Sequence, residues 1–160
     1  MDKSATRHDP RGRVGVVSDR PPLEVSVACE QPLSGVLVVR LRGDLDLGTA
    51  GPVRNAVTEA VARTDPHRLV LDLSEVTLLS SHGMDTLMTL LKNARAQRFH
   101  LVLTGASRRA VRLPLRIAGL LPLFDIRPDV AHALTGATGP ATPPAHRGEC
   151  GTARRLRGTP

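Results

Sequence analysis

The chain has 160 residues, a length typical of one domain, and 41% of them are hydrophobic, which is enough to form a buried core. Phe99 and Phe124 are its only aromatic residues, so aliphatic side chains must fill that core. No run of about 18 apolar residues occurs, and residues 1–22 lack the apolar segment of a secretory signal. We therefore expect a cytoplasmic protein with no membrane association, whose two cysteines, Cys29 and Cys150, are reduced.

The net charge of +7 lies mostly outside the middle of the chain. Residues 1–22 have an excess of two positive charges and residues 135–160 an excess of three, whereas residues 23–134 carry thirteen basic and eleven acidic groups. No aromatic residues are interleaved with the basic ones to stack on bases. We expect no direct nucleic-acid partner, although the Arg-rich stretch at 153–158 leaves a weak contact with anions open.

Composition also divides the chain into three parts. Residues 1–22 are polar, and nine of the last 26 residues are Gly or Pro. Such segments bury too little apolar surface to offset the entropy lost on ordering. We expect disordered segments at 1–22 and 135–160, on either side of one domain at 23–134.

The domain begins with a strand pattern followed by a helix pattern. Apolar residues alternate with polar ones at 23–27, a turn follows at 30–35, and 36–42 forms a second strand, which together indicate a hairpin. Apolar residues then recur three and four positions apart, which predicts an amphipathic helix. Thr49 can cap this helix, with Pro52 tolerated in its first turn.

The second half of the domain continues the alternation. Its expected elements are a buried strand at 68–73, a helix over Met84 to Ala94, a buried strand at 100–105, a helix from Ser107 to Gly119, a short strand at 123–126 and a last helical turn at 129–134. Pro114 removes the N–H that would bond to Ala110, so we expect the third helix to kink or split. This order of elements predicts an α/β layer fold.

The stretch "LLSSHGMD" (residues 78–85) interrupts the apolar pattern where the second helix starts. Ser81 and His82 make a poor nucleophile and base, because sequence neighbours do not face each other on a helix and no G-x-S-x-G elbow is present. His82 and Asp85 supply fewer ligands than a structural zinc site needs, and no Gly-rich nucleotide motif occurs. We expect no enzyme activity, no metal and no cofactor.

Two roles for these serines remain open. Ser81 or Ser80 can cap the helix, since serine is a favoured N-cap, and Gly83 permits a tight start; spacing alone favours a cap over a phosphate acceptor, and we expect Ser81 to be the cap of the unmodified protein. A serine there can also accept a phosphate group, which would meet outward-pointing amides and the positive end of the helix dipole. The added charge of about −2 would change the surface that a partner meets.

Three strings resemble the STAS domain of bacterial anti-sigma factor antagonists, also called anti-anti-sigma factors. They are "LRGDLDLGTAGPVRNAV" at 41–57, "LVLDLSEVTLLSSHGMDTLMTLL" at 69–91 and "RRAVRLPLRIAGLLPLFDI" at 108–126. The second is similar to a family signature of D-L-S, a few residues, then D-S-S-G. The resemblance covers residues 23–134 and implies a single STAS-like domain with a central mixed sheet, in which parallel strands follow an N-terminal hairpin, and about four helices.

The resemblance also implies a function in transcription regulation. Members of the family bind an anti-sigma factor, often a serine kinase that itself binds ATP, and thereby release a sigma factor. Phosphorylation of the first serine of D-S-S-G breaks the complex, and the corresponding residue here is Ser81, with Ser80 as a second candidate. The residues that match the partner-binding loops are Gly43, Asp44, Asp46, Ser80, Ser81, His82, Gly83 and Asp85.

The signature departs from the family pattern at three positions. Ser80 stands where the family has Asp, His82 where it has the second serine, and Asp85 where it has a small residue. Asp85 would repel a phosphate on Ser81, which a protonated His82 would offset in part. A degenerate protein that binds or scaffolds without phosphorylation is therefore the alternative. For Asp46 the alternative role is turn chemistry, in which its side chain accepts from nearby amides.

Overall fold

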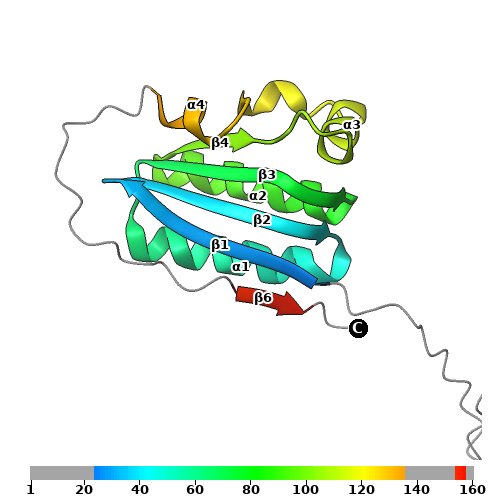
Figure 1. Cartoon of the computed structure of the whole chain (residues 1–160), viewed down its shortest axis with the longest axis horizontal. Coiled ribbons are helices and arrows are strands. Elements are labelled where there is room, and N and C mark those ends of the chain that lie inside the picture. Colours follow the sequence, from blue (N-terminus) through cyan, green and yellow to red (C-terminus); the bar gives the residue numbers. More distant parts are fainter. Residues whose placement is uncertain (1–23, 136–153, 158–160) are drawn as a thin grey trace, which may run out of the picture.

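The structure is a computed structural model that describes residues 24–135 and 154–157. Figure 1 shows the course of the chain from the first strand to the last. The elements are β1 (Glu24–Leu33), β2 (Val36–Leu45), α1 (Leu47–Thr64), β3 (Arg68–Leu79), α2 (Ser81–Gln97), β4 (His100–Thr104), α3 (Arg109–Ile117), the 3₁₀ turn η1 (Leu121–Leu123), β5 (Asp125–Arg127), α4 (Val130–Leu134) and β6 (Arg154–Arg157). The order from β1 to α4 confirms the predicted α/β fold with four helices.

The strands form one mixed sheet in the order β5-β4-β3-β2-β1-β6. The hairpin of β1 and β2 is antiparallel, and β2, β3, β4 and β5 are parallel to one another. This arrangement confirms the predicted N-terminal hairpin followed by parallel strands. The hairpin turn is tighter than predicted, because β1 continues to Leu33 and only residues 34–35 separate it from β2.

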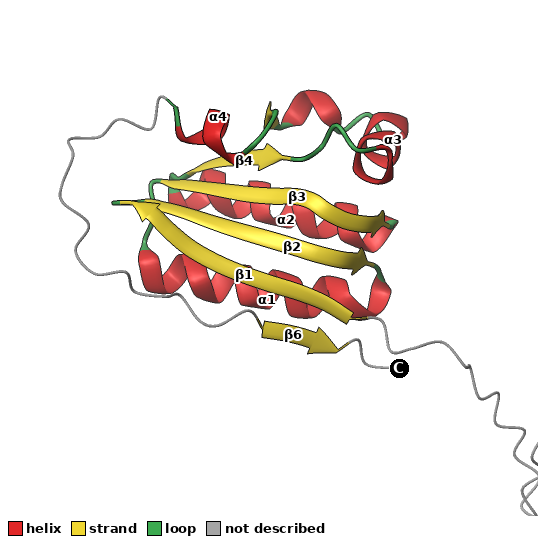
Figure 2. Cartoon of the chain, in the orientation of Figure 1, coloured by secondary structure: helices red, strands yellow, loops and turns green. Residues whose placement is uncertain are grey.

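The two faces of the sheet are covered unequally. Helices α1 and α2 lie side by side against one face (Figure 2), where the larger hydrophobic cluster unites the sheet with the apolar stripe of α1, α2 and α3. The other face carries a smaller cluster of Val36, Val38, Val70, Val102 and Ala133, so α4 covers only one end of it. Because strand side chains alternate between faces, the same strands contribute to both clusters.

Helix α1 begins earlier than predicted. Its N-cap is Asp46, whose carboxylate accepts from the N–H groups of Gly48 and Thr49 at 3.0 and 3.2 Å, while the Asp46 N–H donates to the Thr49 hydroxyl at 3.0 Å. The prediction of Thr49 as the cap is wrong, because this reciprocal capping box adds helical residues ahead of the apolar stripe. Pro52 is consequently the sixth helical residue rather than part of the first turn.

Helix α3 runs without interruption from Arg109 to Ile117, with Pro114 inside it. Of the predicted kink or split, the split is therefore wrong, and the helix begins at Arg109 rather than at the predicted Ser107. Val111 and Leu115 are both fully buried in the larger cluster, and their packing offsets the hydrogen bond that Pro114 cannot donate. Gly119, with φ of +69°, follows the helix, which confirms it as the residue that ends this segment.

A strand also forms within the C-terminal segment. Residues 154–157 pair antiparallel with β1, from Glu24 opposite Arg157 to Val27 opposite Arg154, where the prediction was disorder. The edge of β1 offers unpaired backbone groups to any strand that reaches it, a feature that composition alone does not reveal. Residues 1–23, 136–153 and 158–160, Cys150 among them, lie outside the described residues, so the outer limits of the domain stay a prediction.

Candidate functional site

The two segments singled out by the sequence meet at one end of the sheet. Strands β2 and β3 are parallel neighbours, with Gly43 opposite Val76 and Leu45 opposite Leu79. Because the carboxyl ends of parallel strands lie at the same edge, α1 and α2 begin next to each other. The structure thus brings the G-D-L-D segment, residues 43–46, beside residues 80–85; this segment forms the end of β2 and the N-cap of α1 rather than a loop.

Ser80, and not Ser81, is the N-cap of α2. Its backbone is extended, with φ of −83° and ψ of 176°, and its hydroxyl accepts from the Gly83 N–H at 3.3 Å. The Ser80 N–H donates to the Leu45 carbonyl at 2.9 Å, which ties the start of α2 to the end of β2. Of the two serines expected as possible caps, Ser80 is confirmed and Ser81 is wrong, because this tie fixes Ser80 in the extended conformation that a cap requires.

Gly83 is buried where α2 packs on the ends of β2 and β3. A Cβ atom at this position would lie 2.7 Å from Leu79 Cδ1, 2.8 Å from the Leu45 carbonyl oxygen and 2.9 Å from Leu45 Cβ. Backbone atoms cannot move aside as a flexible side chain can. The glycine of the motif therefore has a packing reason of its own, independent of any partner.

Ser81, His82 and Asp85 are exposed in the first turns of α2. Ser81 is the first helical residue, where backbone N–H groups lack intrahelical partners. Asp85 follows Ser81 by four positions, so the two side chains share a helix face. Within residues 24–135 and 154–157, no hydrogen bond joins Ser81 to His82, so the structure holds no oriented nucleophile and base at this helix start.

The G-D-L-D segment is held by hydrogen bonds from α1 and β3. Gly43 has φ of +111°, in the region that favours glycine. The Thr49 hydroxyl donates to the Asp44 carbonyl at 2.6 Å, and the Asp44 carboxylate accepts from the Thr77 hydroxyl. For Asp46 the turn-chemistry alternative is confirmed by the capping box. Sequence reasoning did not identify Thr77 as part of this site, since only the pairing of β2 with β3 brings it beside Asp44.

Two exposed leucines flank this site. Leu47, the first residue of α1, is 73% exposed, and Leu78, near the end of β3, is 46% exposed. Sequence reasoning did not identify them, because both follow apolar or turn patterns that resemble core positions. Large exposed apolar side chains beside polar ones are typical of protein interaction sites.

The part of the chain that the structure describes also bears on metal binding and membrane insertion. No group of three or more potential metal ligands gathers among these residues. No helix among them has the length and apolar character needed to cross a bilayer. At this end of the sheet, the exposed side chains of Leu47 and Leu78 lie together with the exposed hydroxyl of Ser81 and imidazole of His82.

Comparison with known proteins relates the chain to one family. Residues 31–133 match the STAS domain. The anti-sigma-F factor antagonist RsfB of Mycobacterium tuberculosis is 36% identical over 107 residues, which cover 66% of this chain and 84% of RsfB. The anti-sigma F factor antagonist of Paenibacillus polymyxa is 30% identical over 101 residues, which cover 63% of this chain and 86% of that protein.

Solved structures give the same relation. An anti-sigma factor antagonist from Mycobacterium paratuberculosis superposes with a TM-score of 0.58 at 30% identity, covering 69% of this chain and 92% of that one. Unphosphorylated SpoIIAA superposes with a TM-score of 0.59 at 16% identity, covering 69% and 96%, and supports the fold alone. The relatives are regulators and not enzymes, in agreement with the prediction. The chain therefore belongs to the STAS domain family, among the anti-sigma factor antagonists.

Proposed function

We propose that this chain binds an anti-sigma factor in the cytoplasm and thereby releases a sigma factor. The observation that carries the proposal is the joint surface at the starts of α1 and α2, where Leu47 and Leu78 are exposed beside Ser81 and His82. Apolar anchors within a polar rim are the usual composition of a protein interface. The relatives named as anti-sigma factor antagonists support this partner class.

The partner we propose is an anti-sigma factor of the serine-kinase type, which itself binds ATP, with Ser81 as the residue it phosphorylates. The Ser81 hydroxyl is exposed and is not used as a cap, whereas the Ser80 hydroxyl is engaged with the Gly83 N–H. A phosphate on Ser81 would lie at the helix N-terminus, where amides and the dipole favour an anion. These points favour Ser81 over Ser80 as the acceptor.

The alternative is an antagonist that binds its partner without being switched. Asp85 lies on the helix face of Ser81 and would repel a phosphate placed there. That repulsion supports a constitutive binder or scaffold. The two proposals share the binding surface and differ only in whether Ser81 is modified.

The test uses ATP and the serine-kinase anti-sigma factors of the source organism. Wild type, Ser81→Ala and Ser80→Ala are assayed for phosphate by mass spectrometry and for complex formation by gel filtration. Ser34→Ala is the matched control, since Ser34 is also exposed but lies in the hairpin turn at the other end of β2. We expect incorporation to disappear only in Ser81→Ala, and modified wild type to leave the complex.

Other outcomes discriminate between the proposals. Complex formation without phosphate in any variant supports the constitutive binder. Phosphate that persists in Ser81→Ala and disappears in Ser80→Ala moves the acceptor to Ser80. The binding proposal itself is contradicted if the folded wild type forms no complex with any candidate kinase. Leu47→Ala and Leu78→Ala, if also folded, would then behave no differently from wild type.

A further inference from the structure

Helix α3 has two chemically distinct faces. Val111 and Leu115 are fully buried on one of them. The exposed face carries Arg109, Arg112 and Arg116. At 3.6 residues per turn these three arginines fall within about 60° of one another around the helix axis. A cationic stripe therefore runs along the exposed face of α3, a different element from α2, which carries Ser81.

The charge of this stripe is not neutralised within the described parts of the chain. Ion pairs hold other arginines there, such as Arg40 with Glu30 at 2.9 Å and Arg127 with Asp125 at 2.9 Å. Arg109, Arg112 and Arg116 take part in none of the ion pairs of residues 24–135 and 154–157, and α3 contains no acidic residue. Three like charges on one helix face repel one another, so a bound anionic group would relieve that repulsion.

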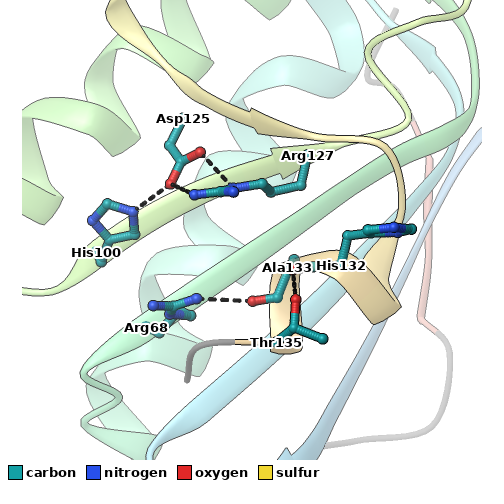
Figure 3. A network of polar contacts seen from close by, with 7 residues as sticks. All are labelled: Arg68, His100, Asp125, Arg127, His132, Ala133 and Thr135. Atoms are coloured by element: carbon teal, nitrogen blue, oxygen red, sulfur yellow. Dashed lines mark hydrogen bonds and ion pairs between the residues drawn. The ribbon is translucent and has the colours of Figure 1, made fainter. Parts of the chain in front are cut away.

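Apolar side chains lie at the far end of the stripe. Ile117, the last residue of α3, is 76% exposed, and Leu123 in η1 is 44% exposed. The stripe also borders a cavity of about 380 Å³, which is lined by Ala106, Ser107, Arg112, Leu121, Ile126, Arg127 and Pro128. Figure 3 shows the Arg127 guanidinium turned toward Asp125, which leaves Arg112 as the unpaired cation of the lining.

We propose that the α3 surface, formed by Arg109, Arg112, Arg116, Ile117 and Leu123, docks an acidic amphipathic segment of a partner protein. Guanidinium groups donate paired hydrogen bonds to carboxylates, so the stripe suits Glu or Asp side chains spaced along a helix or extended segment. A large apolar side chain of the same segment then packs on Ile117 and Leu123 or enters the cavity. Nucleic acid fits less well, because the exposed aliphatic groups offer no stacking surface for bases.

The inference goes beyond the proposed function, since it does not depend on which protein meets Ser81. Helix α3 packs against both β3 and α2. In Figure 1 it lies toward the end of the sheet where β3 leads into α2. A single partner with an acidic segment can therefore reach both surfaces, and an unrelated partner can use α3 alone.

The test is an NMR titration of the isotope-labelled full chain with a synthetic amphipathic peptide of Glu and Leu. Backbone amides and arginine Nε–H signals are followed. We expect shifts at Arg109, Arg112, Arg116 and Ile117, with binding weakened roughly tenfold in Arg112→Glu/Arg116→Glu. The matched control is Lys92→Glu/Arg95→Glu, which makes the same charge change on exposed positions of α2 and should leave binding nearly unchanged.

Three outcomes would overturn the inference. The first is equal weakening in both double variants, which means that only net charge matters. The second is an unchanged response when every Glu of the peptide is replaced by Gln, which removes the role of carboxylates. The third is tighter binding of a DNA duplex than of the peptide at equal salt, which assigns the stripe to nucleic acid. Because no anti-sigma factor enters the titration, its failure leaves the proposed function untouched.

Discussion

The starts of α1 and α2 lie side by side at the candidate site, yet they are built in opposite ways. The start of α1 is closed by a reciprocal capping box, and Thr49 is fully buried within it. The start of α2 has one side-chain cap bond, from the Gly83 N–H to the Ser80 hydroxyl at 3.3 Å, and Ser81 and His82 stand free beside it. One helix start fixes the shape of the surface, and the other leaves its polar groups available to a partner.

The largest effect we expect distinguishes the glycines of the two helices. Gly83→Ala places a methyl group 2.8 Å from the Leu45 carbonyl oxygen and should lower the free energy of unfolding. An overpacking penalty of about 1–3 kcal/mol outweighs the better helix propensity of Ala. Gly51→Ala in α1 meets nothing within 4 Å and should raise the free energy of unfolding by about 0.5–1 kcal/mol.

Urea unfolding followed by circular dichroism measures both changes. The slope of the free energy of unfolding against urea concentration should equal that of wild type, since neither substitution alters the surface exposed on unfolding. Equal stabilisation by the two alanines would show that α2 can move off the end of β2, and the contrast between the two helix starts would then be lost.

The caps themselves give the next effect. Asp46→Ala removes the carboxylate that accepts from Gly48 and Thr49 and should cost about 1–2 kcal/mol. Ser80→Ala removes only one bond of 3.3 Å and should cost about 0.5–1 kcal/mol. The same unfolding measurement applies. A larger loss for Ser80→Ala than for Asp46→Ala would contradict the view that α1 is the more firmly fixed start.

How far the sequence predicts this end of the sheet depends on the range of the interactions. The apolar stripe of α1 and the run at 68–73 arise from local periodicity, so sequence reasoning found them. The cap at Asp46 is also local, since its partners Gly48 and Thr49 follow within three residues, and the turn chemistry expected for Asp46 reflects this; the cap at Ser80 depends on a distant segment. Ser80 is fixed by the Leu45 carbonyl, which lies far away in sequence. A pattern within one segment cannot encode such a contact.

The same limit explains what was missed elsewhere. Strand β6 exists because β1 has a free edge, and continuity of α3 through Pro114 depends on the burial of Val111 and Leu115 against the sheet. The exposure of Leu47 and Leu78 likewise follows from where the strands end. Tertiary context decided each of these features, whereas local propensity decided the order of elements.

The start of α4 can be compared with that of α2 by changing the pH, because a carboxylate cap is protonated in acid whereas a serine hydroxyl cap is not. Asp129 caps α4, and its carboxylate accepts a hydrogen bond of 2.8 Å from the backbone N–H of His132. This bond, and after it the hydrogen bond with the His132 side chain, lowers the pKa of Asp129 below its usual value. A lowered pKa means that the cap contributes fully above the unfolded pKa of about 3.9 and is lost as pH falls through the folded value.

NMR detects this small effect directly. The carboxyl carbon shift of Asp129 should titrate below pH 3.9, and hydrogen exchange at His132 should accelerate over the same range. The amide of Gly83, which is capped by the Ser80 hydroxyl, should show no such step. An Asp129 titration at or above its usual value would mean that the hydrogen bonds to His132 do not form in solution.

The smallest effect on stability, and the most informative one, is expected at Ser81. Its side chain is exposed and does not cap α2, so Ser81→Ala should change the free energy of unfolding by no more than about 0.5 kcal/mol. Under the proposed function the same substitution removes the phosphate acceptor. A loss of more than about 1 kcal/mol in urea unfolding would make Ser81 part of the helix cap after all. Unchanged stability together with changed partner binding would instead assign different roles to the two serines, with Ser80 as the helix cap and Ser81 as the partner-facing residue of the proposed function.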